Sequence, residues 1–245
     1  MAVKTKKRAR KKAPSPARLL LRKLLKWAAQ GFWTLLGIQA VVIFLFAFVD
    51  PPTNFYQWSE GRRLEGIRQD WRPIEEVSAD VARAVVAAED ANFCQHWGFD
   101  LGAIRAAVTS GSGRLRGAST LSQQVAKNVF LWPGRNWVRK ALEAEITMMI
   151  ELFWSKRRII EVYLNVAEFD EGVFGVQAAG RHYFGVDAAQ LSLVQAARLA
   201  AILPNPKNRS AKNPSPQSRR RAAGIADGAE TIRLDGRAAC FEVLK

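Results

Sequence analysis

The chain has 245 residues, 49% of them hydrophobic, so it can bury a full core and is not a disordered chain. Its formal net charge of +15 is uneven: residues 1–26 hold eleven Lys and Arg and no acid, which leaves +4 for the other 219 residues. A basic tail on a nearly balanced body argues against a nucleic-acid-binding domain. We therefore expect no nucleic-acid partner.

Residues 27–49 have the pattern of a membrane-spanning helix. These 23 residues carry no charge, and at about 1.5 Å per residue they can cross a hydrocarbon layer of roughly 30 Å. Asp50-Pro51-Pro52 is expected to end the helix. The positive charge before the span predicts a cytoplasmic N-terminus, with the rest of the chain outside. A cleaved signal peptide is the alternative, but the apolar run is too long and no small-x-small cleavage site follows it.

Residues 50–78 resemble an extended stalk or an edge lobe. The aromatic residues Phe55, Tyr56 and Trp58 are expected to lie at the membrane headgroups. Residues 79–90 then place apolar side chains at helical spacing behind Ser78, which is the expected N-cap.

The body that follows, residues 79–206, is predicted to be mainly α, since strand-like alternation is scarce. Helices are expected to begin at Ser119 and to cover residues 138–154 and 156–164. Ser192 and Gln195 fit a capping box that opens a helix, which Pro204 closes. After Pro206 the composition becomes polar, so the core is expected to end there, with a terminal helix or tail over residues 207–245.

The two cysteines, Cys94 and Cys240, are too few for a disulfide framework and have no CxxC or His-rich spacing that would hold zinc. We interpret them as free thiols. A single bridge between them is the alternative outside the cytoplasm, although the sequence does not fix the distance between them.

Glu89 is the first candidate for chemistry. It lies eight positions after Val81, on the same helical stripe as the apolar residues that should face the core. Burial raises the pKa of a carboxyl group toward neutrality, which suits a general base, whereas an ordinary surface Glu would belong on the opposite face. His96 is expected to be a structural histidine that hydrogen-bonds this turn.

The segment 117–128 leads from small residues into a helix with Ser119, Gln123 and Lys127 on one face. A helix N-terminus with free N–H groups, followed one turn later by a Lys, binds phosphate well. The alternative is a Ser N-cap and a solvated Lys.

Glu143 borders an apolar stripe and stands four residues after Arg139. A surface ion pair at this spacing would stabilise the helix by only about 0.3–0.5 kcal/mol. In the functional interpretation Glu143 is instead a second acid, and Arg139 and Lys140 meet an anionic leaving group.

Together these segments resemble glycosyltransferase family 51, the peptidoglycan polymerases, over about residues 78–206. Because the chain stops soon afterwards, it looks like the monofunctional biosynthetic peptidoglycan transglycosylases. One departure is Gly117-Ala118, where many members have Gly-Gly. The motifs in order are Glu89-Asp90 with Phe93, His96 and Gly98; Gly117 to Asn128; Arg139-Lys140 to Glu151; Lys156 to Asn165; and Leu191 to Pro204.

The resemblance implies a lysozyme-like domain that polymerises lipid II with release of undecaprenyl diphosphate. In that interpretation Glu89 is the general base. Glu143 is a second catalytic acid, which either holds a cationic cluster or binds Mg²⁺ or Mn²⁺ with the diphosphate; no tightly bound cofactor is expected. The implied substrate-binding residues are Asp90, Ser119, Gln123, Gln124, Lys127, Arg139 and Lys140.

The implied location is the cell inner membrane, with one span, a cytoplasmic tail of residues 1–26 and a periplasmic catalytic domain. The expected partners are lipid II, the lipid-linked nascent glycan, the membrane and other cell-wall synthesis proteins. One alternative is a muramidase or lytic transglycosylase, which would not need the phosphate-binding Ser and Lys. The other is a non-catalytic membrane-tethered scaffold.

Overall fold

The computed structural model describes residues 16–109, 119–134 and 136–242. Gly117, Ala118 and most of the expected basic tail lie outside these ranges. The chain divides into two compact units, Met1–Val42 and Ile43–Lys245.

The first unit contains most of helix α1 (Pro16–Leu45). Within the described ranges this is the one helix that is long and apolar enough to cross a membrane, as judged by length and composition. The prediction of a single N-terminal apolar helix is confirmed, but the helix begins earlier than Trp27 because the basic residues before it are also helical.

The helix α1 ends at Leu45, before the prolines that were expected to stop it. Two side chains of the second unit bind carbonyl groups at this end, and helix carbonyls without an intrahelical partner need such donors. Trp154 Nε1 donates to the Ile43 carbonyl at 2.7 Å, and Arg158 Nε donates to the Phe46 carbonyl at 3.1 Å. The end of this helix therefore coincides with hydrogen bonds from Trp154 and Arg158 rather than with a proline.

Residues 50–78 form an edge lobe rather than an extended stalk. Helix α2 (Phe55–Arg63) opens with a capping box made by Asn54 and Gln57. It is followed by the short strand β1 (Arg68–Gln69) and the 3₁₀ turn η1 (Ile74–Glu76). Phe55 and Trp58 are exposed as expected, but the Tyr56 hydroxyl points inward and donates to Glu168 at 2.7 Å.

A small sheet joins this lobe to the rest of the second unit. Its strand order is β1-β3-β2, with β2 at Glu168–Asp170 and β3 at Val173–Phe174. Strand β3 pairs with β1 in parallel and with β2 antiparallel. Strands of two or three residues are too short to show an alternating pattern, so the sequence does not predict them.

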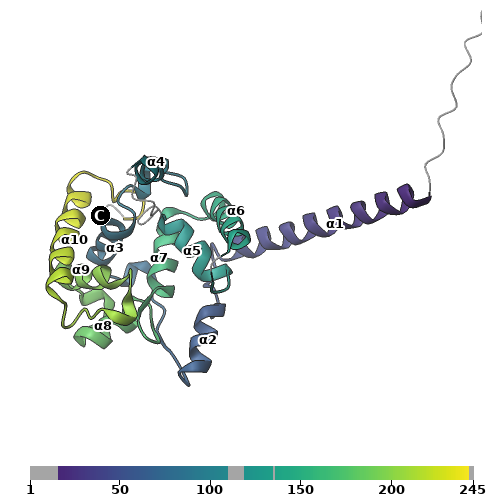
Figure 1. Ribbon diagram of the computed structural model, residues 1–245. Coiled ribbons are helices and arrows are strands. Elements are labelled where there is room, and N and C mark those ends of the chain that lie inside the picture. The colour runs from purple at the N-terminus through teal and green to yellow at the C-terminus, as the bar shows by residue number, and fades with distance from the viewer. Residues whose placement is uncertain (1–15, 110–118, 135, 243–245) are drawn as a thin grey trace, which may run out of the picture. The chain divides into compact units, whose positions relative to one another are not determined.

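The remainder of the second unit is helical, which confirms the mainly α prediction (Figure 1). Its core consists mostly of aliphatic side chains from several helices, including Val85, Ile150, Ile160 and Leu199. The elements are α3 (Ala79–Glu89), η2 (Phe93–Gln95), α4 (Leu101–Thr109), α5 (Leu121–Phe130), α6 (Trp137–Phe153), α7 (Lys156–Val166), α8 (Val176–Phe184), η3 (Ala188–Gln190), α9 (Leu193–Ile202), η4 (Pro206–Asn208) and α10 (Pro216–Leu234).

The predicted caps are right in one place and incomplete in two. Ser192 and Gln195 form the expected capping box at α9. Ser78 occupies the N-cap position of α3, but its side chain makes no capping hydrogen bond. The helix expected to begin at Ser119 begins two residues later, with Thr120 as its N-cap and Gln123 completing the box. Ser119 is therefore exposed and outside the helix.

The packed core continues past Pro206, where it was expected to end. Helix α10 lies against α3 and α9, and it buries Ala222, Ile225, Ala229 and Ile232 (Figure 1). Its apolar positions are small and interrupted by charged residues, which makes the stripe hard to recognise in the sequence.

The prediction of two free thiols is wrong. Cys94 and Cys240 form a disulfide with their Cα atoms 5.7 Å apart. Because α10 packs beside α3, the turn after α10 ends next to η2, and two cysteines separated by 146 positions come together.

Candidate functional site

Glu89 is the last residue of α3 and follows the buried stripe of Val81 and Val85, as its spacing predicts. Only 15% of its side chain is exposed. Burial raises the pKa of Glu89 above its ordinary value, although Gln124, Arg221 and Lys127 act in the opposite direction. A carboxyl group with these properties can accept a proton from a substrate near neutral pH.

The Glu89 carboxylate is held by side chains from two other helices. Gln124 of α5 donates from Nε2 to Glu89 Oε2 at 2.9 Å, and the Tyr163 hydroxyl of α7 donates to Gln124 Oε1 at 3.3 Å. Burial raises the pKa of Tyr163 well above its usual value, so its hydroxyl stays protonated as a donor. Because Oε1 of Gln124 accepts from Tyr163, the amide is oriented with its Nε2 group toward Glu89.

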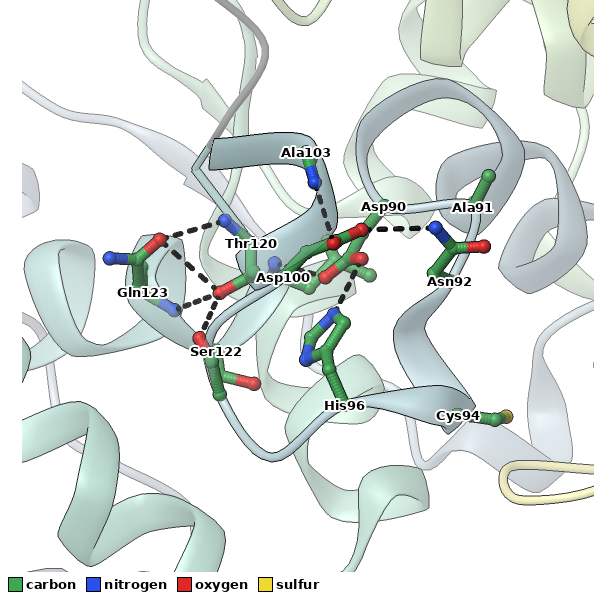
Figure 2. Close-up of polar contacts among 12 residues, drawn as sticks. Asp90, Ala91, Asn92, Cys94, His96, Asp100, Ala103, Thr120, Ser122 and Gln123 are labelled. Atoms are coloured by element: carbon green, nitrogen blue, oxygen red, sulfur yellow. Dashed lines mark hydrogen bonds and ion pairs between the residues drawn. The ribbon is translucent and has the colours of Figure 1, made fainter. Parts of the chain in front are cut away.

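Asp90 lies beside Glu89 but points into the protein (Figure 2). Its Oδ1 lies 2.8 Å from His96 Nε2, and its Oδ2 accepts from the Leu121 N–H at 2.9 Å. His96 is thus a structural histidine, as predicted. Asp90 thus links the end of α3 to the start of α5.

The N-terminus of α5 is already occupied by protein groups. Leu121 N–H donates to Asp90, and Gln123 N–H donates to the Thr120 hydroxyl at 3.3 Å. Gln123 Oε1 in turn accepts from the Thr120 N–H at 3.0 Å, and its side chain is buried. This helix end is therefore not the open anion cradle that the sequence suggested, and Gln123 serves the capping box (Figure 2).

Lys127 lies two turns into α5, largely buried. Within the described ranges its ammonium has no ion-pair partner, although Glu143 and Glu89 act on it at longer range. Burial lowers the pKa of Lys127 below its ordinary value. A desolvated cation without a partner is unfavourable in the free protein, and an anionic ligand would relieve that cost.

Two neighbouring pockets share Lys127, Asn128 and Tyr56 in their walls. One has a volume of about 170 Å³ and also contains Gln124 and Tyr163, and the other has about 180 Å³ and also contains Trp132 and Arg139. Burial and the bond to Glu168 raise the pKa of Tyr56 to about 12.

A third pocket of about 260 Å³ brings together Glu89, Asp90, Asn92, Asp100 and Ser119. Gln124, which hydrogen-bonds Glu89, lies in the wall of the Lys127 pocket. The proton acceptor thus faces one pocket and is bonded to the wall of the next. Ser119 belongs to the Glu89 side rather than to the Lys127 side.

The cationic pair Arg139 and Lys140 stands at the start of α6. Lys140 forms an ion pair with Glu143, which is buried, whereas no Arg139–Glu143 pair exists among the described residues. The alternative interpretation, a surface ion pair between Arg139 and Glu143, is thus not found, and the i+3 neighbour Lys140 pairs with Glu143 instead. Among the described residues, no hydrogen-bond partner is found for the buried Nε of Arg139, and Arg139 also lines the Trp132 pocket.

A fully paired cluster lies on another face of α5. The Ser122 hydroxyl donates to Glu151, and Lys156 Nζ lies 2.8 Å from the same carboxylate. Lys156 also donates to the His96 carbonyl at 2.8 Å. Gly98 packs on this cluster with φ +81°, where a Cβ would come within 2.8 Å of Thr147 Cγ2, so a side chain does not fit.

The described residues offer no group of three or more His, Cys, Asp or Glu side chains that could hold a metal ion. Glu143, for which two roles were left open, holding a cationic cluster or binding Mg²⁺ or Mn²⁺, forms an ion pair with Lys140. Within the described ranges, no cluster of side chains fits a divalent metal that the protein would hold by itself.

Sequence reasoning missed several side chains of this site. Tyr163 stood within a motif but received no role, because its place behind Gln124 depends on the packing of α7 on α5. Tyr56 was taken for a membrane anchor. Arg221, whose Nη2 lies 3.8 Å from Glu89 Oε1, gave no signal, since α10 was expected to lie outside the core.

Known proteins with similar sequences agree over most of the chain. A biosynthetic peptidoglycan transglycosylase of Jannaschia sp. (strain CCS1) is 55% identical over 237 residues, which cover 96% of this chain and 98% of that protein. A protein of the same name from Pseudomonas putida (strain W619) is 49% identical over 216 residues, 84% of this chain and 91% of its own length. One from Pseudomonas fluorescens (strain Pf0-1) is 47% identical over 220 residues, 85% of this chain and 88% of its own length.

The model of the transglycosylase family matches residues 58–229, which include every site residue expected from the sequence and most of α10. With relatives of about half-identical sequence over nearly the whole chain, this match shows that the chain belongs to the transglycosylase family, glycosyltransferase family 51.

Proposed function

We propose that this chain polymerises lipid II into peptidoglycan glycan strands at the outer face of the cell inner membrane, releasing undecaprenyl diphosphate. One observation carries the proposal. A buried carboxyl group, Glu89, is bonded through Gln124 to the wall of a pocket that contains Lys127, whose largely buried ammonium has no ion-pair partner in the part of the chain that the structure describes. A proton acceptor beside an anion-binding cation is what glycosyl transfer from a diphosphate requires.

In the proposed step, Glu89 takes the proton of the acceptor's 4-hydroxyl group as the oxygen attacks the anomeric carbon of the lipid-linked chain. The new C–O bond forms while the bond from that carbon to the diphosphate oxygen breaks, so the configuration inverts. General-base catalysis of this kind contributes about 10²- to 10⁴-fold in rate.

The departing diphosphate gains negative charge as that bond breaks. We assign Lys127 as the cation that stabilises it, with Arg139 in the wall of the adjoining pocket and Lys140 next to it in the chain. Glu143 holds Lys140 at the start of α6 by their ion pair, which makes it a positioning residue for the cations rather than a second proton donor. Any Mg²⁺ or Mn²⁺ in the reaction is proposed to arrive with the substrate diphosphate, and no step here depends on it.

The same proposal places the second unit in the periplasm, with α1 as its anchor. The charge excess before the apolar segment supports a cytoplasmic N-terminus. The Cys94–Cys240 disulfide supports an oxidising compartment, since such bonds are rare in the cytosol. Exposed aromatic residues, among them Phe55, Trp58 and Trp137, supply side chains that favour a membrane interface.

The direct test incubates the detergent-solubilised full chain with labelled lipid II and looks for a polymer that lysozyme digests. The expected result is such a polymer with the parental chain and almost none with Glu89→Gln. Glu76→Gln, which alters an exposed carboxylate whose surface ion pair adds little stability, should polymerise at the parental rate. Cleavage of preformed glycan without polymerisation would instead identify a muramidase or lytic transglycosylase and refute the proposal.

The location has a separate test. A reporter that folds only outside the cytoplasm, fused after Lys245, should be active. Activity of a cytoplasm-only reporter at the same position would reverse the proposed topology.

A further inference from the structure

Arg221 of α10 contacts the end of the helix that carries the proposed base. Its Nη2 atom lies 3.8 Å from Glu89 Oε1 and donates to the Ala88 carbonyl at 3.5 Å. Gln124 meanwhile bonds the other carboxylate oxygen, Oε2. The two oxygens of Glu89 are thus approached from two different helices, α10 and α5.

The segment after α3 is fastened to the C-terminal arm, which we define as residues 216–242. Besides the Arg221 contact at Ala88, the Arg237 guanidinium donates to the Ala91 carbonyl at 3.2 Å. The Cys94–Cys240 disulfide makes a third, covalent link. The backbone on both sides of Glu89 is therefore held by the arm.

Close packing sets the distance between α10 and α3. Gly228 lies so near α3 that an added Cβ would stand 3.3 Å from Ala87 Cβ. Ile225 and Ala229 of α10 are also buried, and α10 packs against both α3 and α9. A helix packed this tightly cannot slide along α3, so Arg221 stays beside the end of α3.

We infer that Arg221 is a positioning residue that holds Oε1 of Glu89 while Gln124 holds Oε2, so that the C-terminal arm sets the orientation of the base. The inference rests on the proposed role of Glu89. The inference extends the site beyond the motif-bearing residues 78–206 to α10, in a segment that was expected from the sequence to be a terminal helix or tail outside the core.

The charges around Glu89 give this contact a chemical consequence. The groups that face it are Gln124 and Lys127 from α5, Tyr163 from α7, Arg221 from α10 and the adjacent Asp90. Arg221 and Lys127 lower the pKa of Glu89, while Asp90 and, above all, burial raise it. When a donor diphosphate neutralises Lys127, Arg221 continues to favour the ionised, proton-accepting form of Glu89.

The test compares pH–rate profiles of lipid II polymerisation by the full-length parental chain, Arg221→Gln, Arg221→Lys and Arg220→Gln. The rate falls on the acid side as Glu89 becomes protonated. Without Arg221 that pKa rises, so the acid limb of kcat/KM should move to higher pH by about half a unit to one unit for a partly exposed ion pair at this distance. At pH values below the acid limbs of both proteins, kcat/KM of Arg221→Gln should be about three- to tenfold lower than that of the parental chain. On the alkaline plateau the two values should differ little.

Arg221→Lys should restore most of the shift, because it keeps the charge. Arg220→Gln removes the same charge from an exposed neighbouring position and should leave the limb unchanged. Melting temperatures measured in the same detergent show whether each variant is folded. An acid limb of Arg221→Gln that coincides with the parental one, or an equal loss of rate at every pH, would overturn the inference.

Glu89→Gln, measured in parallel, distinguishes a failure of the proposed role of Glu89 from a failure of the proposed role of Arg221. If it polymerises lipid II at the parental rate, the role of Glu89 in the proposed function fails. If it is inactive while Arg221→Gln keeps the parental acid limb, only the role of Arg221 fails.

Discussion

Helix α5 carries two polar regions that differ in one respect. On one side, Ser122 contacts Glu151, and Glu151 pairs with Lys156, so that donor, carboxylate and ammonium satisfy one another. On the other side, Gln124 contacts Glu89, while Lys127 has no ion-pair partner among the described residues. Both regions are largely buried, yet only the second keeps a charge available to a ligand.

This difference separates what holds the fold from what performs chemistry. A buried charge that is paired and hydrogen-bonded keeps elements in register, and here Lys156 also binds the His96 carbonyl near the turn that follows α3. A buried charge left unpaired lowers the stability of the free protein, and that is reason to look for a function. The predictions below test this division, from the largest expected effect to the smallest.

Lys156→Met should destabilise the fold by about 3–5 kcal/mol, because it leaves the Glu151 carboxylate buried without its cation. Chemical denaturation of the detergent-solubilised chain would measure the change. The double variant Lys156→Met with Glu151→Leu should recover much of the loss, since it removes both charges. An unchanged midpoint in the single variant would mean that this cluster does not support the fold.

Lys127→Met should lower the rate of lipid II polymerisation by about 10²- to 10³-fold, the loss typical of removing one group that stabilises transition-state charge. Its stability should stay equal or rise, because burial lowers the pKa of Lys127 and thus disfavours its charged form in the folded state. The matched control is Lys212→Met, which removes an exposed Lys. A variant with parental activity would mark Lys127 as structural.

Replacing both cysteines with Ser should lower the free energy of unfolding by about 2–4 kcal/mol, since the bond closes a long loop. Denaturation midpoints of the parental chain with and without a reductant would check this independently. The same midpoint in both conditions would contradict a stabilising role for the bond.

The smallest expected effect is that Glu89→Gln changes how the stability of the fold depends on pH. Because the folded-state pKa of Glu89 is raised, the parental chain loses stability as pH rises through that pKa, whereas the Gln variant does not. The variant should thus melt at the parental temperature near pH 4 and about 2 °C higher at neutral pH. A melting temperature that is lower at neutral pH would show that the ionised carboxylate stabilises the fold.

Sequence patterns predicted α3, α5, α6, α7 and α9 because each of these helices has its own local signal, whereas α2, α4 and α8 were not predicted. The stripe through Val81 and Val85 placed Glu89 correctly, and the Ser192 and Gln195 box located the start of α9. At α5 the same reasoning chose Ser119, whereas Thr120 caps the helix because it also bonds the Gly98 carbonyl at 2.7 Å. Local patterns do not contain that long-range choice.

The features that sequence could not supply depend on which elements meet in space. The disulfide, the Gln124 bridge to Tyr163 and the contact of Arg221 with Glu89 each join residues that are far apart in the chain. None changes the composition or spacing around it. The sequence therefore did not predict how these side chains are held.

The most direct test of the central claim compares Glu89→Gln with Glu151→Gln, two isosteric changes of buried carboxyl groups on opposite sides of the division. Polymerisation rate and melting temperature are measured for both in one preparation. We predict that Glu89→Gln loses about 10²- to 10⁴-fold in rate without losing stability, whereas Glu151→Gln melts at a lower temperature. A Glu89→Gln chain that polymerises lipid II at near the parental rate would contradict the account.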